Sequence, residues 1–397
     1  MPTEEKKNLV DPFAYIKAAA AITIFLIHTR VFSSLQGYVI TGANWYMKTA
    51  AHGAVWVFFF LSGYFNICGF LGAEPRYRLD LQGIIKFYTG RFFKVLLPVW
   101  CFYLIALVIS EPAFLHMYPG VLFRLLTFTY TGEPGCSSIA ATWYVSSLAW
   151  LYAVTPFAAW FCRKLEKING FIHLFLFAFA GAGLGLMERL YLLWRGTDWT
   201  QGVFVPAYCN LDIYICGALA FMIAKRIRLS VGSRLLYASS IIVFSALLLC
   251  HSRINYLGDI NGKYVILHEY LMPTVYILVM TFVCIMISST GYRYLSADID
   301  AIRKNPLRLI DAFSLISFQF YLVHSMVLFQ LSPYIGGADG FQYNLRLTVA
   351  GFVISVLLSV LLRKATAFKV PGSGKSVKEG EKRSAAGRTE SDINMRL

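Results

Sequence analysis

Long apolar runs dominate the pattern of hydrophobic and polar positions along the chain. Ten of these runs are long enough to cross the hydrocarbon core of a bilayer as α-helices, and short polar or charged segments separate them. The pattern therefore predicts an all-α, polytopic integral membrane protein with about ten transmembrane helices. The predicted spans are 13–32, 53–71, 95–111, 141–162, 171–190, 208–225, 233–250, 268–288, 310–331 and 343–363.

The two ends of the chain lie outside the membrane domain, which we expect to occupy residues 13–365. Residues 1–12 form a short N-terminal segment. The apolar run that follows it is too long for a signal-peptide core and has no small-residue cleavage site, so we expect an uncleaved anchor helix. Residues 366–397 form a basic tail that, from Pro371 onward, is rich in Gly, Ser, Lys and Glu and lacks aromatic residues, which predicts disorder.

Composition and charge agree with this prediction and orient the chain. Only 14% of the residues are charged and 57% are hydrophobic, whereas soluble domains are about 25% charged and 45–50% apolar. The net charge is +15. Of the 36 Lys and Arg residues, 27 fall on the side of the two termini, 8 on the other side, and Lys17 lies inside the first span. The positive-inside rule then predicts a cell (inner) membrane protein with both termini in the cytoplasm, and the positive charge requires no nucleic-acid partner.

The eight cysteines are spread singly, without CxxC or Cys/His zinc spacing, so we expect no metal. Most of them lie in apolar runs, where a thiol behaves as a small hydrophobic group. Cys136 and Cys209 fall near one membrane face; the sequence favours unpaired thiols there and leaves a disulfide open.

Ionisable residues inside a span are energetically costly and are therefore the first functional candidates. Lys17 and His28 are eleven residues apart, which places both on one face of a helix, about 16 Å apart along its axis. His324 lies in the ninth span at a depth similar to that of His28. The alternative interpretations are a snorkelling lysine at the inner interface and hydrogen-bonded interfacial histidines.

Three further groups allow two interpretations each. Ser62 and Gly63 interrupt an aromatic run, either as a helix-packing patch or as a place where a ligand approaches the backbone. Arg91 and Lys94 are three residues apart on a helical entry to the third span and share a predicted face, either as ordinary inner-face charges or as a clamp for phosphates. Other groups near the outer level either converge in one cavity with the histidines or cap helix ends; they are Glu188, Arg189, Asp212, His268 and Glu269.

With these residues in view, the chain resembles the integral-membrane acyltransferase family 3. Five short motifs occur in the family's order over residues 10–330. They are Lys17, ten residues, then His28; Phe59, Phe60, Ser62 and Gly63; Arg91, Lys94 and Pro98; Trp143, Tyr144, Tyr152 and Pro156; and Tyr321, Leu322, Val323 and His324. Lys17 and Lys94 stand where the family usually has arginine, which keeps the charge but loses the bidentate fork. Leu148 stands where many members have Glu, as in the branch with surface-polysaccharide acetyltransferases.

The resemblance implies a membrane-bound acyltransferase of groups other than amino-acyl groups, most readily an O-acetyltransferase active in polysaccharide modification. It implies acetyl-CoA as a cytoplasmic donor and a hydroxyl of an extracytoplasmic surface or cell-wall saccharide as acceptor. Lys17, Arg91 and Lys94 would hold the phosphates of the donor. His28 would act as general base or carry the acyl group transiently, and Ser62 or His324 would orient the acyl carbonyl.

Other functional classes use the same kinds of residue. Histidines and acids inside spans also line the pathways of transporters, here an exporter of polysaccharide or a permease for a small amino acid, although no inverted repeat is evident. A non-catalytic scaffold or sensor is the third class. The sequence leaves open the acceptor, the acyl group, direct transfer against an acyl-histidine intermediate, and the oligomeric state.

Overall fold

The computed structural model describes residues 11–29, 43–110, 119–130, 143–168, 172–197, 199–227, 229–261, 265–290, 308–336 and 340–365. Over these ranges the chain is helical and contains no strand, which confirms the all-α prediction. Nine of the described helices are long and apolar enough to cross a membrane, and a tenth, Pro12–His28, is apolar but shorter. The predicted polytopic membrane fold is therefore confirmed. The cytoplasmic N-terminus and the disordered tail lie outside the described residues.

The α-helices follow one another along the chain with short connections. Their bounds are α1 Pro12–His28, α2 Ala43–Leu71, α3 Leu81–Arg91, α4 Leu97–Ser110, α6 Pro119–Leu126, α7 Trp143–Glu166, α8 Ile172–Trp194, α9 Leu211–Arg226, α10 Ser233–Asn261, α11 Val265–Ser289, α13 Arg308–Leu331 and α14 Gly340–Ala365. Short π and 3₁₀ segments complete the list, η3 Phe92–Leu96, η5 Trp199–Phe204, η6 Tyr208–Asn210 and η7 Ser332–Tyr334.

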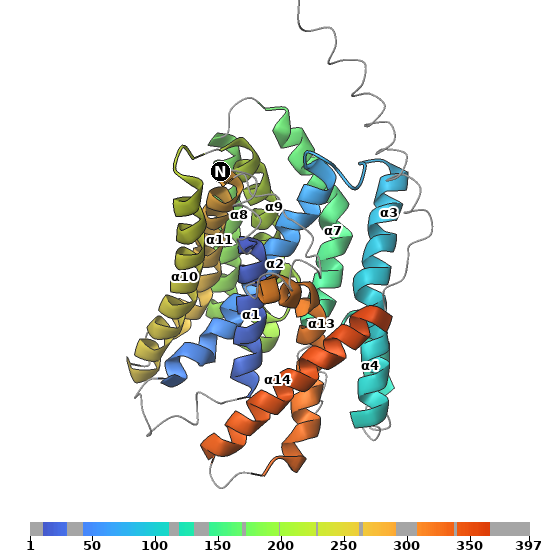
Figure 1. Ribbon diagram of the computed structural model, residues 1–397. Helices are drawn as coiled ribbons and strands as arrows, with labels where there is room; N and C mark the ends of the chain where they lie inside the picture. The colour runs from blue at the N-terminus through green and yellow to red at the C-terminus, as the bar shows by residue number, and fades with distance from the viewer. Residues whose placement is uncertain are drawn as a thin grey trace, which may run out of the picture.

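Helix α2 lies at the centre of the bundle and packs against α1, α7, α9, α10 and α11. On one side of it the chain forms the pair α1–α13, with α14 crossing obliquely over α13 (Figure 1). The α3–α4 rod stands at one edge of the bundle, and α10 and α11 stand at the opposite edge (Figure 1). Outward-facing side chains of α7 and α8 such as Phe157, Phe179 and Met187 are exposed, as lipid contact requires.

Helix α1 has 17 residues and is shorter than the predicted span 13–32. Asp11 caps its N-terminus by accepting a hydrogen bond from the backbone N–H of Phe13, and Pro12 occupies the first turn, where its missing N–H is harmless. The helix ends at His28, with Thr29 as its C-cap. His28 therefore sits on the last turn of α1.

The third predicted span, 95–111, is the second half of a longer rod that runs through α3, η3 and α4. The rod changes from α to π geometry at Phe92–Leu96, where the backbone N–H of Leu97 bonds to the carbonyl of Phe92, five residues earlier. Pro98 follows at once and has no N–H to donate, so the regular α-helical bonding pattern is interrupted at this point. The predicted helical entry that carries Arg91 is confirmed, with a widened turn inside it.

Helices α2 and α9 cross at two glycines. A β-carbon at Gly63 would lie 2.0 Å from the carbonyl oxygen of Tyr214, and one at Gly217 would lie 2.1 Å from that of Phe60. Both positions therefore require glycine for the two backbones to approach this closely. Gly181 and Gly185 similarly face α9, whereas a β-carbon at Gly183 would meet nothing within 4 Å.

Cys209 is buried, and its thiol points to the carbonyl of Gly202. Cys136 lies outside the described residues, so the open question of a pair between them stays a prediction.

We predict that Gly63→Ala destabilises the protein by about 1–3 kcal/mol or more, because the new methyl group overlaps the Tyr214 carbonyl in a rigid crossing. Thermal unfolding in detergent, followed by loss of the monodisperse peak in size-exclusion chromatography, measures the change. Gly183→Ala is the matched control and should be neutral or slightly stabilising. Equal melting temperatures for the two variants would contradict the close crossing.

Candidate functional site

A cavity of about 350 Å³ lies between α1, α2, α7, α13 and η5. Its lining consists of Ile24, Ile27, His28, Ala51, His52, Val55, Trp143, Phe204 and Tyr321. These residues come from the last turns of α1 and the first turn of α7, so the cavity lies away from the helix ends that carry Arg163, Lys164, Lys225 and Arg226. We call the latter end of the bundle the basic end, and the end near the cavity the opposite end.

His28 forms part of the cavity wall, and its ring has a defined orientation. Its Nδ1 lies 2.7 Å from the carbonyl oxygen of Ile24, one turn earlier in α1. A carbonyl only accepts hydrogen bonds, so Nδ1 carries the proton and Nε2 of the neutral ring keeps its lone pair. The last turn of α1 thus presents a bare nitrogen base at the cavity.

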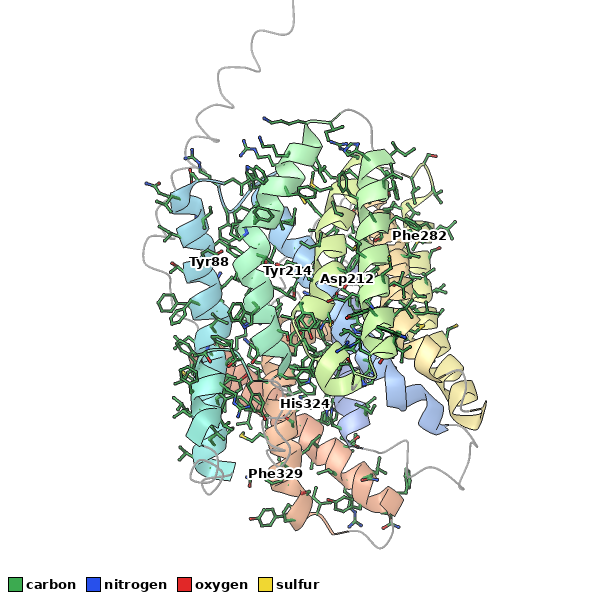
Figure 2. All side chains as sticks on the ribbon, turned by 180° about the vertical axis from the view of Figure 1, so that it is seen from behind. Tyr88, Asp212, Tyr214, Phe282, His324 and Phe329 are labelled. Atoms are coloured by element: carbon green, nitrogen blue, oxygen red, sulfur yellow. The ribbon has the colours of Figure 1, made fainter. Side chains whose placement is uncertain are left out.

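His324 lies directly behind His28, with 5.0 Å between the two ring centroids in an edge-to-face arrangement. Figure 2 shows it on α13, nearer the opposite end than Asp212 and Tyr214. Its Nδ1 is 2.6 Å from the carbonyl oxygen of Tyr321, which again fixes the proton on Nδ1. Its side chain is buried, and its Nε2 has no hydrogen-bond partner within the described part of the chain. The structure therefore brings His28 and His324 together.

Ser62 does not line the cavity. Its hydroxyl hydrogen-bonds to the phenol of Tyr144, whose ring lies 5.3 Å from that of Tyr321 on the cavity wall. Ser62 therefore lies one aromatic layer away from the space beside His28.

Lys17 lies nearer the basic end, where α1 and α13 begin. The backbone N–H of Asp11 donates to the Asp311 carboxylate at 3.0 Å, and both carboxylates interact electrostatically with Lys17. Burial raises the pKa of the Asp11 carboxyl to about 6, an effect that the nearby Lys17 opposes. The ammonium also lies 5.8 Å above the ring of Phe65 in α2. Lys17 thus joins the starts of the two histidine-bearing helices.

Arg91 points into the bundle and makes contacts with neutral groups. Its guanidinium donates to the side-chain oxygen of Asn66 and lies over the rings of Phe87 and Tyr152, 5.3 and 5.0 Å from their centroids. Asn66 in turn donates to the phenol of Tyr214 at 2.7 Å. The resulting polar network links α2, α3, α7 and α9 inside the membrane domain, where each polar group needs a partner.

Lys94 is exposed, whereas Arg91 is half-buried. The π turn lies between them, and its extra residue rotates Lys94 away from the face on which an α-helix would align it with Arg91. The predicted shared face of these two residues is therefore wrong, although both remain near the basic end.

The other outer-level residues do not converge on the histidines. Arg189 and Asp212 form a buried ion pair of 2.8 Å that holds α8 against α9, and neither lines the histidine cavity. The side chains of His268 and Glu269 lie outside the described residues. Within the described residues, no group of three or more His, Cys, Asp or Glu side chains could hold a metal ion.

The sequence did not single out His52, Phe204 or Trp143 as site residues. His52 stood at the edge of the second predicted span, but α2 begins at Ala43, so His52 lies inside the helix and on the cavity wall. Phe204 belongs to η5, a segment without the periodicity of a span. Trp143 was noted only as part of a motif, and its position on the wall depends on tertiary packing.

Comparison with known protein families gives one match. The model of an acyltransferase domain, acyltransferase family 3, matches residues 13–364, which is nearly the whole described chain. Comparisons with curated proteins and with solved structures find no match.

We predict that Lys17→Met lowers the stability of the protein, because it leaves two neighbouring carboxylates without their cation. Breaking a buried ion pair costs about 3–5 kcal/mol, and we expect the lower end because Lys17 is only partly buried. Adding Asp311→Asn should restore part of the loss, measured as thermal unfolding in detergent. Lys94→Met, at an exposed lysine, is the control. Strictly additive effects of Lys17→Met and Asp311→Asn would contradict the coupling.

Proposed function

The chain belongs to acyltransferase family 3, and on that premise we propose that it is a membrane-bound O-acyltransferase. In this proposal it moves acetyl from cytoplasmic acetyl-CoA to a hydroxyl of an extracytoplasmic surface or cell-wall saccharide, in the cell membrane with both termini in the cytoplasm. The observation that carries the proposal is the bare Nε2 of His28 at the wall of a cavity.

The proposed reaction uses His28 as a general base. Its Nε2 takes the proton of the acceptor hydroxyl while the oxygen attacks the thioester carbonyl. The tetrahedral intermediate then collapses, the carbon–sulfur bond breaks, and the departing thiolate takes the proton back from His28. The Ile24 carbonyl supports this cycle because it holds the ring orientation, as an orienting acceptor at Nδ1 does in other histidine bases. Direct transfer needs no acyl-histidine intermediate.

His324 has a different role in this proposal from the one that the sequence suggested. A neutral ring with its proton on Nδ1 cannot donate through Nε2, so it cannot orient the acyl carbonyl by hydrogen bonding. The same Nε2 can accept a hydrogen bond from His28 once His28 is protonated. Because the surroundings are apolar, this bond would stabilise the imidazolium and so favour proton abstraction.

The donor would approach from the basic end. Lys17 lies about 16 Å from His28 along α1, a distance that the linear arm of a coenzyme A thioester can span. Arg91 contacts neutral groups, which leave its positive charge uncompensated, and Lys94 is exposed. We assign these three cations to the donor phosphates, with Ser62 supporting the Tyr144 layer between the two ends.

We predict that His28→Ala lowers acetyl transfer by about 10²–10⁴-fold, the usual contribution of a positioned base. The measurement is ester-linked acetate on the cell-surface glycan and thiol release from acetyl-CoA by the protein in nanodiscs. His173→Ala, a histidine at the other end of α8, is the control and should keep full activity. Unchanged acetylation in His28→Ala would contradict the site. Substrate uptake or export without any acyl product would instead favour a transporter.

We predict that His324→Phe lowers kcat by about 10–100-fold with little change in the donor KM, because a hydrogen bond to a charged group is worth about 1.5–3 kcal/mol. His324→Gln keeps an acceptor oxygen and should retain more activity than His324→Phe. The measurement is steady-state thiol release in nanodiscs. Equal losses for the two variants would indicate a packing role for His324.

A further inference from the structure

Three aromatic rings form one side of the histidine cavity. The ring of His52, from α2, lies 4.5 Å from that of Phe204 in η5, and the ring of Trp143, from α7, lies 4.9 Å from Phe204 on its other side. All three side chains line the cavity that His28 also lines. We call His52, Phe204 and Trp143 the aromatic wall.

The aromatic wall is held by buried hydrogen bonds. The hydroxyl of Ser147 in α7 donates to the carbonyl of Val205, next to Phe204, at 2.5 Å. The side-chain amide of Asn210 donates to the carbonyls of Phe204 and Pro206, at 2.9 Å each. These bonds fix an irregular segment against α7 and the start of α9, so the wall is formed before any ligand binds.

A second layer of rings supports His52 from behind. The ring of Trp56 lies 6.5 Å from His52 and stacks on His251 at 5.7 Å. His251 is hydrogen-bonded to the phenol of Tyr276 at 3.1 Å. Close packing of this kind restricts the ring of His52 to few positions.

The position and chemistry of the wall indicate which reactant it faces. The cavity lies towards the opposite end of the bundle, whereas the cations assigned to the donor lie near the basic end. Its volume of about 350 Å³ is at the small end of the range for ligand pockets. Broad apolar ring faces beside one imidazole match a compact ligand that has both a C–H face and hydroxyl groups.

We propose that the aromatic wall is the acceptor subsite and that it holds a single pyranose ring. Trp143 and Phe204 pack against the C–H face of the sugar, and His52 hydrogen-bonds to a hydroxyl other than the one that is acylated. The acylated hydroxyl then faces His28 across the cavity. This inference rests on the proposed function for the direction of transfer, but the binding of the sugar can be measured without any reaction.

The test uses the full chain in nanodiscs and a panel of methyl pyranosides, those of glucose, galactose, mannose and N-acetylglucosamine. Binding is measured by saturation-transfer NMR, and transfer is measured from acetyl-CoA. We expect at least one glycoside to bind, and Trp143→Ala and His52→Ala to weaken its binding about tenfold. Trp150→Ala is the matched control, because Trp150 lies two turns along α7, is exposed and lines a different cavity.

Thiol release from acetyl-CoA with water as acceptor separates a binding role from a structural one. It should stay unchanged in Trp143→Ala and His52→Ala, and His52→Gln should keep more sugar affinity than His52→Ala. Failure of every glycoside to bind, or equal affinities in Trp143→Ala and Trp150→Ala, would overturn the subsite. A glycoside that binds at the wall but is never acetylated would leave the subsite standing and contradict the proposed function.

Discussion

The pairing of α1 with α13 is the contact on which the site depends, because it alone sets His28 beside His324. The two helices are joined near their starts by the bond from Asp11 to the Asp311 carboxylate, with Lys17 between the two acids. Further along, Phe25 packs against Phe320 with 5.4 Å between ring centroids. Both histidines follow within one turn of this ring pair, so a shift of one helix along the other would separate them.

Low polarity around this pair explains how simple backbone contacts can determine its chemistry. A helix carbonyl already accepts an N–H bond from the next turn, yet it has a second lone pair that an imidazole can use. His28 and His324 each place Nδ1–H on such a carbonyl and keep Nε2 bare. No acid needs to be buried to orient either ring, which avoids the large cost of an isolated charge in an apolar region. The Arg91–Asn66–Tyr214 network follows the same rule, since neutral partners surround a single cation.

Much of this fold could be predicted from the sequence, because a bilayer imposes length and hydropathy on each helix separately. The same property limits prediction of the site, which depends on how the helices meet. The eleven-residue spacing of Lys17 and His28 gave a shared face because both lie within one α-helix. The three-residue spacing of Arg91 and Lys94 did not, because Pro98 is associated with a π turn that local periodicity does not reveal. His52 and Phe204 reach the cavity through an extended helix and an irregular segment, and neither has a sequence pattern that points to a site.

The depth at which α1 begins connects the two ends of the proposed reaction. Phe13 packs against Tyr64 and Phe65, which lie six or seven residues before the end of α2, so α1 starts about 10 Å inside the end of its neighbour. Figure 1 shows the same offset for α1 and α13 relative to α2 and α3. The hydrocarbon core of a bilayer is about 30 Å thick, whereas Lys17 and His28 are separated by only about half of that thickness. If the donor is held at Lys17, its reactive carbonyl therefore has to cross only the inner part of α1 to meet a hydroxyl at His28. A helix of full length would place the cation and the base too far apart for one extended thioester arm, so the short α1 is what allows a single protein to join reactants from the two sides of a membrane.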